Sequence, residues 1–104
     1  TSFAFIGGGA SNCTCGNYSV IAGGQINRSE ATNTFIGGGT MNLIKPTHNC
    51  STIVGSNLSS LSANMLHAQR LSLSGIPTTD PGVSGVVWRD TSSTTLSTVL
   101  QISL

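Results

Sequence analysis

The sequence predicts an all-β protein whose larger part is a parallel β-helix or β-roll with 15-residue coils. Three segments that align without gaps, 5–12, 20–27 and 35–42, carry this prediction. Each of them repeats an isoleucine, a glycine-rich turn and an asparagine in the same order. At about 3.3 Å per residue, one repeat gives roughly 50 Å of chain, which suits one thin coil with one or two short strands.

Each coil is expected to run as a strand around its isoleucine, then a Gly-Gly step that lets backbones pass closely, then a turn. A fourth, imperfect copy covers residues 51–57, so the repeat region is predicted to span residues 1–62. Asparagine suits the left-handed conformation of a turn. We therefore expect stacked coils to align a ladder of asparagines, which recur at the interval of the repeat: Asn12, Asn27, Asn42 and Asn57.

After the repeats, residues 63–74 are predicted to form a junction strand, because Leu71 and Leu73 alternate with serine. A helical turn over residues 65–70 is the alternative for part of this segment.

Residues 75–104 are predicted to form a small C-terminal β-hairpin cap. The segment opens with a turn-rich connector that contains two prolines. Strands are expected at 85–89 and 96–104, with residues 90–95 as the hairpin loop. Trp88 is expected to pack in the core of this cap, against the alternating apolar residues of the last strand.

Each predicted coil strand carries two adjacent apolar residues, which face opposite ways because side chains alternate along a strand. Both faces of the strand then need cover, and a single stack of coils offers only one interior. The sequence therefore predicts an obligate homo-oligomer, with a homotrimer as the expected form. The residues assigned to the trimer and coil core are Phe5, Ile6, Val20, Ile21, Phe35, Ile36 and Ile53.

Composition and charge argue against several functional classes. Only 7% of the residues are charged and the net charge is +1, so there is no basic patch for nucleic acid or for an anionic membrane surface. No apolar run is long enough to insert into a bilayer. Three carboxylates and two histidines supply few acid or base groups, so we expect no enzyme, no catalytic residue and no cofactor.

The cysteines Cys13, Cys15 and Cys50 are the first candidates for chemistry in the sequence. Free thiols that pack as small apolar residues are the expected state. An interchain disulfide and a zinc site completed by His48 are the alternatives. No metal site is assigned, although His67 is a weak candidate, since three copies could meet on the axis of a trimer.

A surface-binding role is considered for four side chains that suit contact with a receptor or a glycan. These residues are Tyr18, Lys45, His48 and Trp88. The chain opens at Thr1 without a methionine or a hydrophobic leader, as expected of a processed product or a piece of a longer protein.

The coils, with the pattern Ser/Thr-x-Ile-x-Gly-Gly-x-x-Asn, resemble repeats near the ends of bacteriophage tail fibres and other trimeric virion fibres. More distantly they resemble head repeats of trimeric autotransporter adhesins. The segment Pro77-Thr78-Thr79-Asp80-Pro81-Gly82-Val83, with the strands that follow, is similar to a C-terminal ending of phage structural proteins.

The resemblance implies a structural homotrimeric fibre or spike segment at the virion surface, in an extracellular setting. Its partners would be itself, other virion proteins and a host-surface glycan or protein receptor. A bacterial trimeric surface adhesin and a capsid decoration protein are the alternatives. A fibre-borne glycan hydrolase would need Glu30, Asp80 and Asp90 to meet around a groove.

Overall fold

The structure, a computed structural model, describes residues 2–90 and 99–104 and contains strands but no helix within them. No membrane-spanning helix therefore occurs in these ranges. The chain divides into two compact units, the first ending at Leu71 and the second covering Ser72–Leu104. The strands of the first unit are β1 (Phe5–Ile6), β2 (Cys13–Thr14), β3 (Val20–Ile21), β4 (Arg28–Ser29), β5 (Phe35–Ile36), β6 (Leu43–Ile44), β7 (Thr52–Val54) and β8 (Leu66–Ala68). Those of the second unit are β9 (Val87–Asp90) and β10 (Val99–Ile102).

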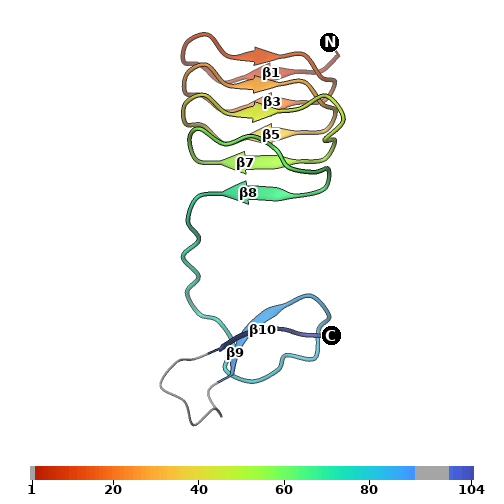
Figure 1. Ribbon diagram of the computed structural model, residues 1–104, viewed down its shortest axis with the longest axis vertical. Coiled ribbons are helices and arrows are strands. Elements are labelled where there is room, and N and C mark those ends of the chain that lie inside the picture. Colours follow the sequence, from red (N-terminus) through yellow and green to blue (C-terminus); the bar gives the residue numbers. More distant parts are fainter. Residues whose placement is uncertain (1, 91–98) are drawn as a thin grey trace. The chain divides into compact units, whose positions relative to one another are not determined.

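The first unit is a β-solenoid in which successive coils stack in parallel (Figure 1). One sheet has the order β1-β3-β5-β7-β8 and a second has the order β2-β4-β6. The register pairs Ile6 with Ile21, Ile21 with Ile36 and Ile36 with Ile53. The predicted fold class is thereby confirmed: stacked parallel β coils that follow the sequence repeat, and then a small antiparallel hairpin.

The corners of the coils hold residues in the left-handed conformation. One column of corners contains Ser11, Ile26 and Met41, with φ of 58°, 55° and 56°. Glycine is required beside this column, where Gly24 has a φ of 90° and a Cβ would overlap the carbonyl oxygen of Gly39 on the next coil. The Gly-Gly step therefore allows both the turn and the close stacking of coils.

The interior of the solenoid is narrow and partly polar. Its apolar residues are Ile21, Ala31, Ile36, Ile44 and Ile53, all buried. Buried hydroxyl groups fill the space at one side, where Ser19 donates to the carbonyl of Ala31 at 2.9 Å and Thr34 donates to Ser19 at 3.0 Å. No buried side-chain nitrogen or oxygen of the described residues lacks a hydrogen-bond partner, so the polar interior is satisfied.

The solenoid extends beyond the predicted boundary at residue 62. Strand β8 continues the first sheet, because Ile53 pairs in parallel with His67. Of the predicted junction strand 63–74, only Leu66–Ala68 forms a strand. In this coil the position of the repeated isoleucine is taken by the buried His67. The apolar repeat pattern therefore did not predict the coil.

The second unit is the predicted antiparallel hairpin, in which Val87 pairs with Ile102 and Trp88 with Gln101. The exposure of the last three residues differs from the expectation. Ile102 and Leu104 are exposed, whereas Ser103 is buried and its hydroxyl donates to Asp80 at 2.7 Å. Most of the expected hairpin loop, residues 90–95, lies outside the described residues.

Candidate functional site

The asparagine ladder joins the first three coils from within. The Asn12 side-chain oxygen accepts hydrogen bonds from the backbone and the side chain of Asn27, both at 3.1 Å. Asn27 in turn accepts from the backbone of Asn42 at 3.1 Å and from its side chain at 3.0 Å. Asn27 and Asn42 are buried, so these bonds are shielded from water. The ladder is a structural feature that holds the coils in register.

Asn57, the expected fourth member, does not join the ladder. The position below Asn42 belongs to Leu58, whose backbone nitrogen donates to the Asn42 side chain at 3.1 Å. Asn57 instead occupies the corner position, with a φ of 59°, and is exposed. The fourth coil holds an extra residue between these points compared with the coils above it, so equal spacing in the sequence does not mean equal position in the coil.

The first sheet carries an outward apolar column, formed by Phe5, Val20, Phe35 and Leu66 together with Thr52. Their neighbours in the strands, such as Ile36, point into the coil, so these side chains point away from it. Phe5 is 58% exposed, Phe35 41% and Leu66 60%. Three of the residues assigned to the trimer and coil core, Phe5, Val20 and Phe35, thus form one continuous outer surface.

Each phenyl ring of this column leans along its own strand. A Cβ placed on Gly37 would lie 3.2 Å from the ring of Phe35 and 3.5 Å from Val54 of the neighbouring strand. Because Gly37 has no side chain, the ring of Phe35 can lie over its backbone. Ile6, which the sequence also assigned to the core, lies in the inward column but is 40% exposed, because it belongs to the first coil.

The four side chains considered for surface binding have different local surroundings. Tyr18 stacks on Phe3, with ring centroids 5.5 Å apart and planes within 10°, and both rings are exposed. Lys45 and His48 share one turn, which is closed by a bond from the His48 amide to the Lys45 carbonyl at 3.0 Å. Trp88 belongs to the second unit, where it is half-buried.

His67 does not offer a ring nitrogen to a metal on a trimer axis. The side chain is only 7% exposed and points into the coil. Its Nε2 accepts a hydrogen bond from the backbone of Leu61 at 2.9 Å, and its Nδ1 lies 3.3 Å from the carbonyl oxygen of Thr52. Both ring nitrogens therefore face backbone groups of the protein, and the histidine closes the end of the isoleucine column.

Acidic residues and potential metal ligands occur in both units. Within the described ranges, no three His, Cys, Asp or Glu side chains are grouped so that they could hold a metal ion. Glu30 is paired with Arg28. The pKa of Asp80 is lowered, first by the amide of Gly82, which donates to it at 2.9 Å, and then by the Ser103 hydroxyl.

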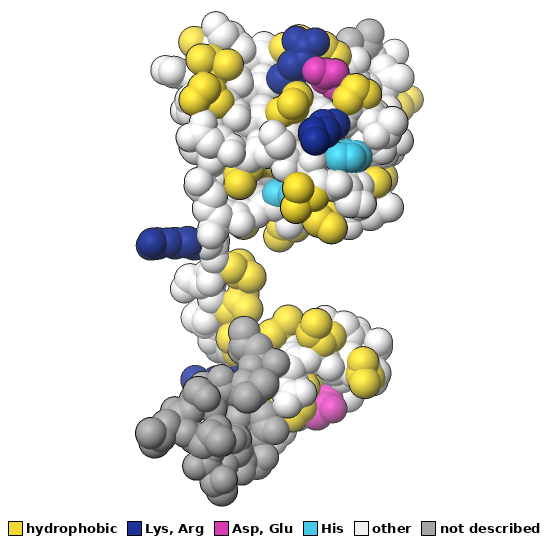
Figure 2. Space-filling model, viewed as in Figure 1, with side chains coloured by type: hydrophobic (Ala, Val, Ile, Leu, Met, Phe, Trp, Pro, Cys, Tyr) yellow, Lys and Arg dark blue, Asp and Glu magenta, His cyan; other side chains and the backbone are white. Residues whose placement is uncertain are grey.

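Figure 2 shows basic, acidic and histidine side chains lying among hydrophobic ones on one face of the solenoid. His48 Nδ1 lies 2.6 Å from the hydroxyl of Ser60, which also accepts a hydrogen bond from the backbone of Lys45 at 2.9 Å. Ser60 is a residue that sequence reasoning missed. Ser60 follows the last copy of the repeat, 51–57, so no periodic signal identified it.

Comparisons of the chain with protein families, with curated proteins and with solved structures find no match.

Proposed function

We propose that this chain is a structural segment of a homotrimeric virion fibre or spike, exposed at the surface of the particle and without catalytic activity. The observation that carries the proposal is the outward apolar column of the first sheet. A surface of this kind on a solenoid of parallel coils suits lateral contact with copies of the same chain, because each copy repeats the same spacing along its axis.

The energetics favour covering this column. Fully burying a Val, Leu or Phe side chain contributes about 1.5–3 kcal/mol. Phe5, Phe35 and Leu66 each retain roughly half of their surface, so burying all three contributes roughly 3 kcal/mol per chain. The Arg28–Glu30 ion pair lies apart from this column, since both residues belong to the second sheet and the turn that follows it. The contact between copies would therefore be largely apolar.

Contact with a host surface is the second part of the proposal. The stacked pair of Phe3 and Tyr18 offers an exposed aromatic platform of the kind that sugar rings pack on. Replacing Tyr18 with Ser is expected to abolish binding to host-cell glycans in a glycan-array measurement and to leave the mass of the assembly unchanged. Binding that is equal in the variant would refute this role for Tyr18.

Variants of the column test the trimer. Phe35→Ser removes about 1 kcal/mol of apolar contact in each of three chains, which corresponds to roughly a 100-fold weaker trimer association. Met41→Ser is the matched control, because Met41 is 52% exposed but lies on a corner of the coil. Sedimentation at several concentrations measures the association of both variants, and circular dichroism verifies that each variant is folded. Equal association of a folded Phe35→Ser variant and the wild type would refute the contact.

The alternatives differ in where the protein is found and in what it does. Antibody labelling seen by electron microscopy on the tail or the capsid fibres of a particle supports the proposal. Labelling over the capsid shell would favour a decoration protein, and labelling of a bacterial envelope would favour an adhesin. Cleavage of a polysaccharide by the purified trimer would instead indicate a hydrolase.

A further inference from the structure

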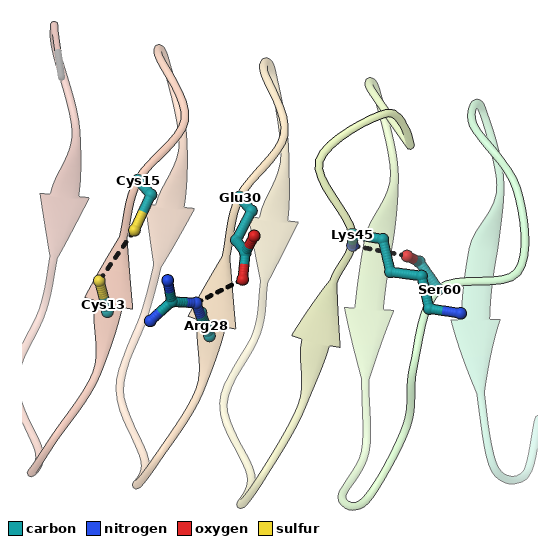
Figure 3. Close-up of polar contacts among 6 residues, drawn as sticks. All are labelled: Cys13, Cys15, Arg28, Glu30, Lys45 and Ser60. Atoms are coloured by element: carbon teal, nitrogen blue, oxygen red, sulfur yellow. Dashed lines mark hydrogen bonds and ion pairs between the residues drawn. The ribbon is translucent and has the colours of Figure 1, made fainter.

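Two cysteines lie in contact on the outer face of the second sheet. The sulfur atoms of Cys13 and Cys15 are 3.1 Å apart, and the two side chains point toward one another in Figure 3. Cys13 pairs with Arg28, whose neighbour Ser29 is buried, so the half-buried Cys13 side chain points away from the coil. Cys15 directly follows β2 and is exposed. Neither sulfur belongs to the core of the solenoid, and the fold does not use them for packing.

We propose that Cys13 and Cys15 form a reversible disulfide at the end of strand β2, by exchange with a low-molecular-weight disulfide such as oxidised glutathione. One protein thiolate attacks a sulfur of the small disulfide, forms a mixed disulfide and releases one small thiolate. The second protein thiol loses its proton and attacks the protein sulfur of that mixed disulfide. The protein disulfide forms and the second small thiolate leaves. Overall, the protein dithiol is oxidised by two electrons, and the small disulfide is reduced to two thiols.

The strand geometry makes this bond possible but labile. Two residues of a strand span about 6.6 Å between Cα atoms, near the upper limit of about 6.8 Å for a disulfide. Closing the bond therefore shortens the chain between Cys13 and Cys15. A strained, exposed disulfide is the kind that a thiol reduces easily. The pair is thus suited to reversible oxidation and not to permanent bracing of the fold.

The surroundings affect the rate of exchange. The hydrogen bond with Cys13 is the largest cause of the raised pKa of the Cys15 thiol, and the positive charge of Arg28 on the next coil acts in the opposite direction. Because its pKa is raised, the Cys15 thiol stays protonated near neutral pH. Because only the thiolate attacks, the exchange is expected to accelerate as the pH rises toward the pKa of the attacking thiol.

Forming the disulfide is also expected to change the backbone hydrogen bonds of the two cysteines. The amide of Cys13 donates to the carbonyl of Asn27 at 2.8 Å, and the amide of Cys15 donates to that of Ser29 at 2.7 Å. These bonds attach the first coil to the second. Drawing Cys15 toward Cys13 displaces its amide from Ser29, so the oxidised protein is expected to exchange the Cys15 amide hydrogen faster than the reduced protein does.

The experiment incubates the reduced protein with oxidised glutathione, blocks the remaining thiols with an alkylating reagent, and maps the cysteines by mass spectrometry. We expect a Cys13–Cys15 disulfide with an alkylated or glutathione-bound Cys50, and full reversal by excess reduced glutathione. Cys50→Ser is the matched control and should form the same disulfide. Cys13→Ser and Cys15→Ser should each stop at the mixed disulfide on the remaining sulfur.

Three results would overturn the proposal. Recovery of both Cys13 and Cys15 as alkylated residues, or as two separate glutathione adducts, would show that the pair does not close. A disulfide that joins two chains would assign these sulfurs to an intermolecular bond. Bridging of the pair by a trivalent arsenical, without closure by oxidised glutathione, would show that the sulfurs are close but that the strand does not permit the bond.

Discussion

Replacing Asn27 with alanine is expected to destabilise the solenoid more than any other single asparagine substitution in the ladder, because Asn27 is its central member. The change removes the oxygen that accepts from the buried backbone amide of Asn42 at 3.1 Å. It also removes the amide group that donates to the Gly23 carbonyl at 3.1 Å. An orphaned buried polar group costs about 1–3 kcal/mol, so the two together lower the free energy of unfolding by about 3 kcal/mol.

The assay is urea unfolding followed by circular dichroism, at equal protein concentrations. Asn57→Gly is the control, because Asn57 is exposed and has a φ of 59°, which glycine adopts without strain. Its free energy of unfolding should stay within about 0.5 kcal/mol of the wild-type value. A loss of less than about 1 kcal/mol in Asn27→Ala, or an equal loss in both variants, would refute the ladder as a source of stability.

Two further predictions concern a glycine and a carboxylate. Gly16→Ala should lower the free energy of unfolding by about 1–3 kcal/mol, because the added Cβ overlaps the carbonyl oxygen of Ala31. Gly23→Ala, where the Cβ meets no atom within 4 Å, should be neutral or slightly stabilising, and an equal loss in both variants would contradict the stacking geometry. The lowered pKa of Asp80 stabilises the second unit at a pH above the ordinary aspartate value, and this stability is lost as the pH falls through the folded-state pKa. An NMR titration of the Gly82 amide should follow the same pKa, and Asp80→Asn should remove the dependence; retention of the pH dependence in that variant would refute this role of Asp80.

The sequence predicted the coil architecture because its main signal is local and periodic. Ile21 and Ile36 repeat at the spacing that stacks one coil on the next, and the strand register follows that spacing. That Phe35 and Ile36 face opposite ways followed equally from alternation along a strand, and the structure shows which of the two is buried. These features depend on the period of the repeat and on the geometry of a strand, both of which can be read from residues alone.

The remaining features could not be predicted, because they depend on how irregular coils take up extra residues. The fourth coil places Leu58 below Asn42, although the regular spacing of the repeat had pointed to Asn57. His67 takes the place of an isoleucine at the end of the core, and no apolar pattern identifies it. Ser103 faces the interior of the second unit because its hydroxyl bonds to Asp80, a contact between residues distant in the sequence.

The molecular mass in solution tests the central claim most directly. Light scattering under native conditions, with and without a reducing agent, measures it for the wild-type chain. We expect a mass of three times 10.6 kDa that is unchanged by the reductant, because the apolar column and not a disulfide would hold the chains together. A folded monomer of 10.6 kDa would contradict the proposed trimer, and the fibre role with it.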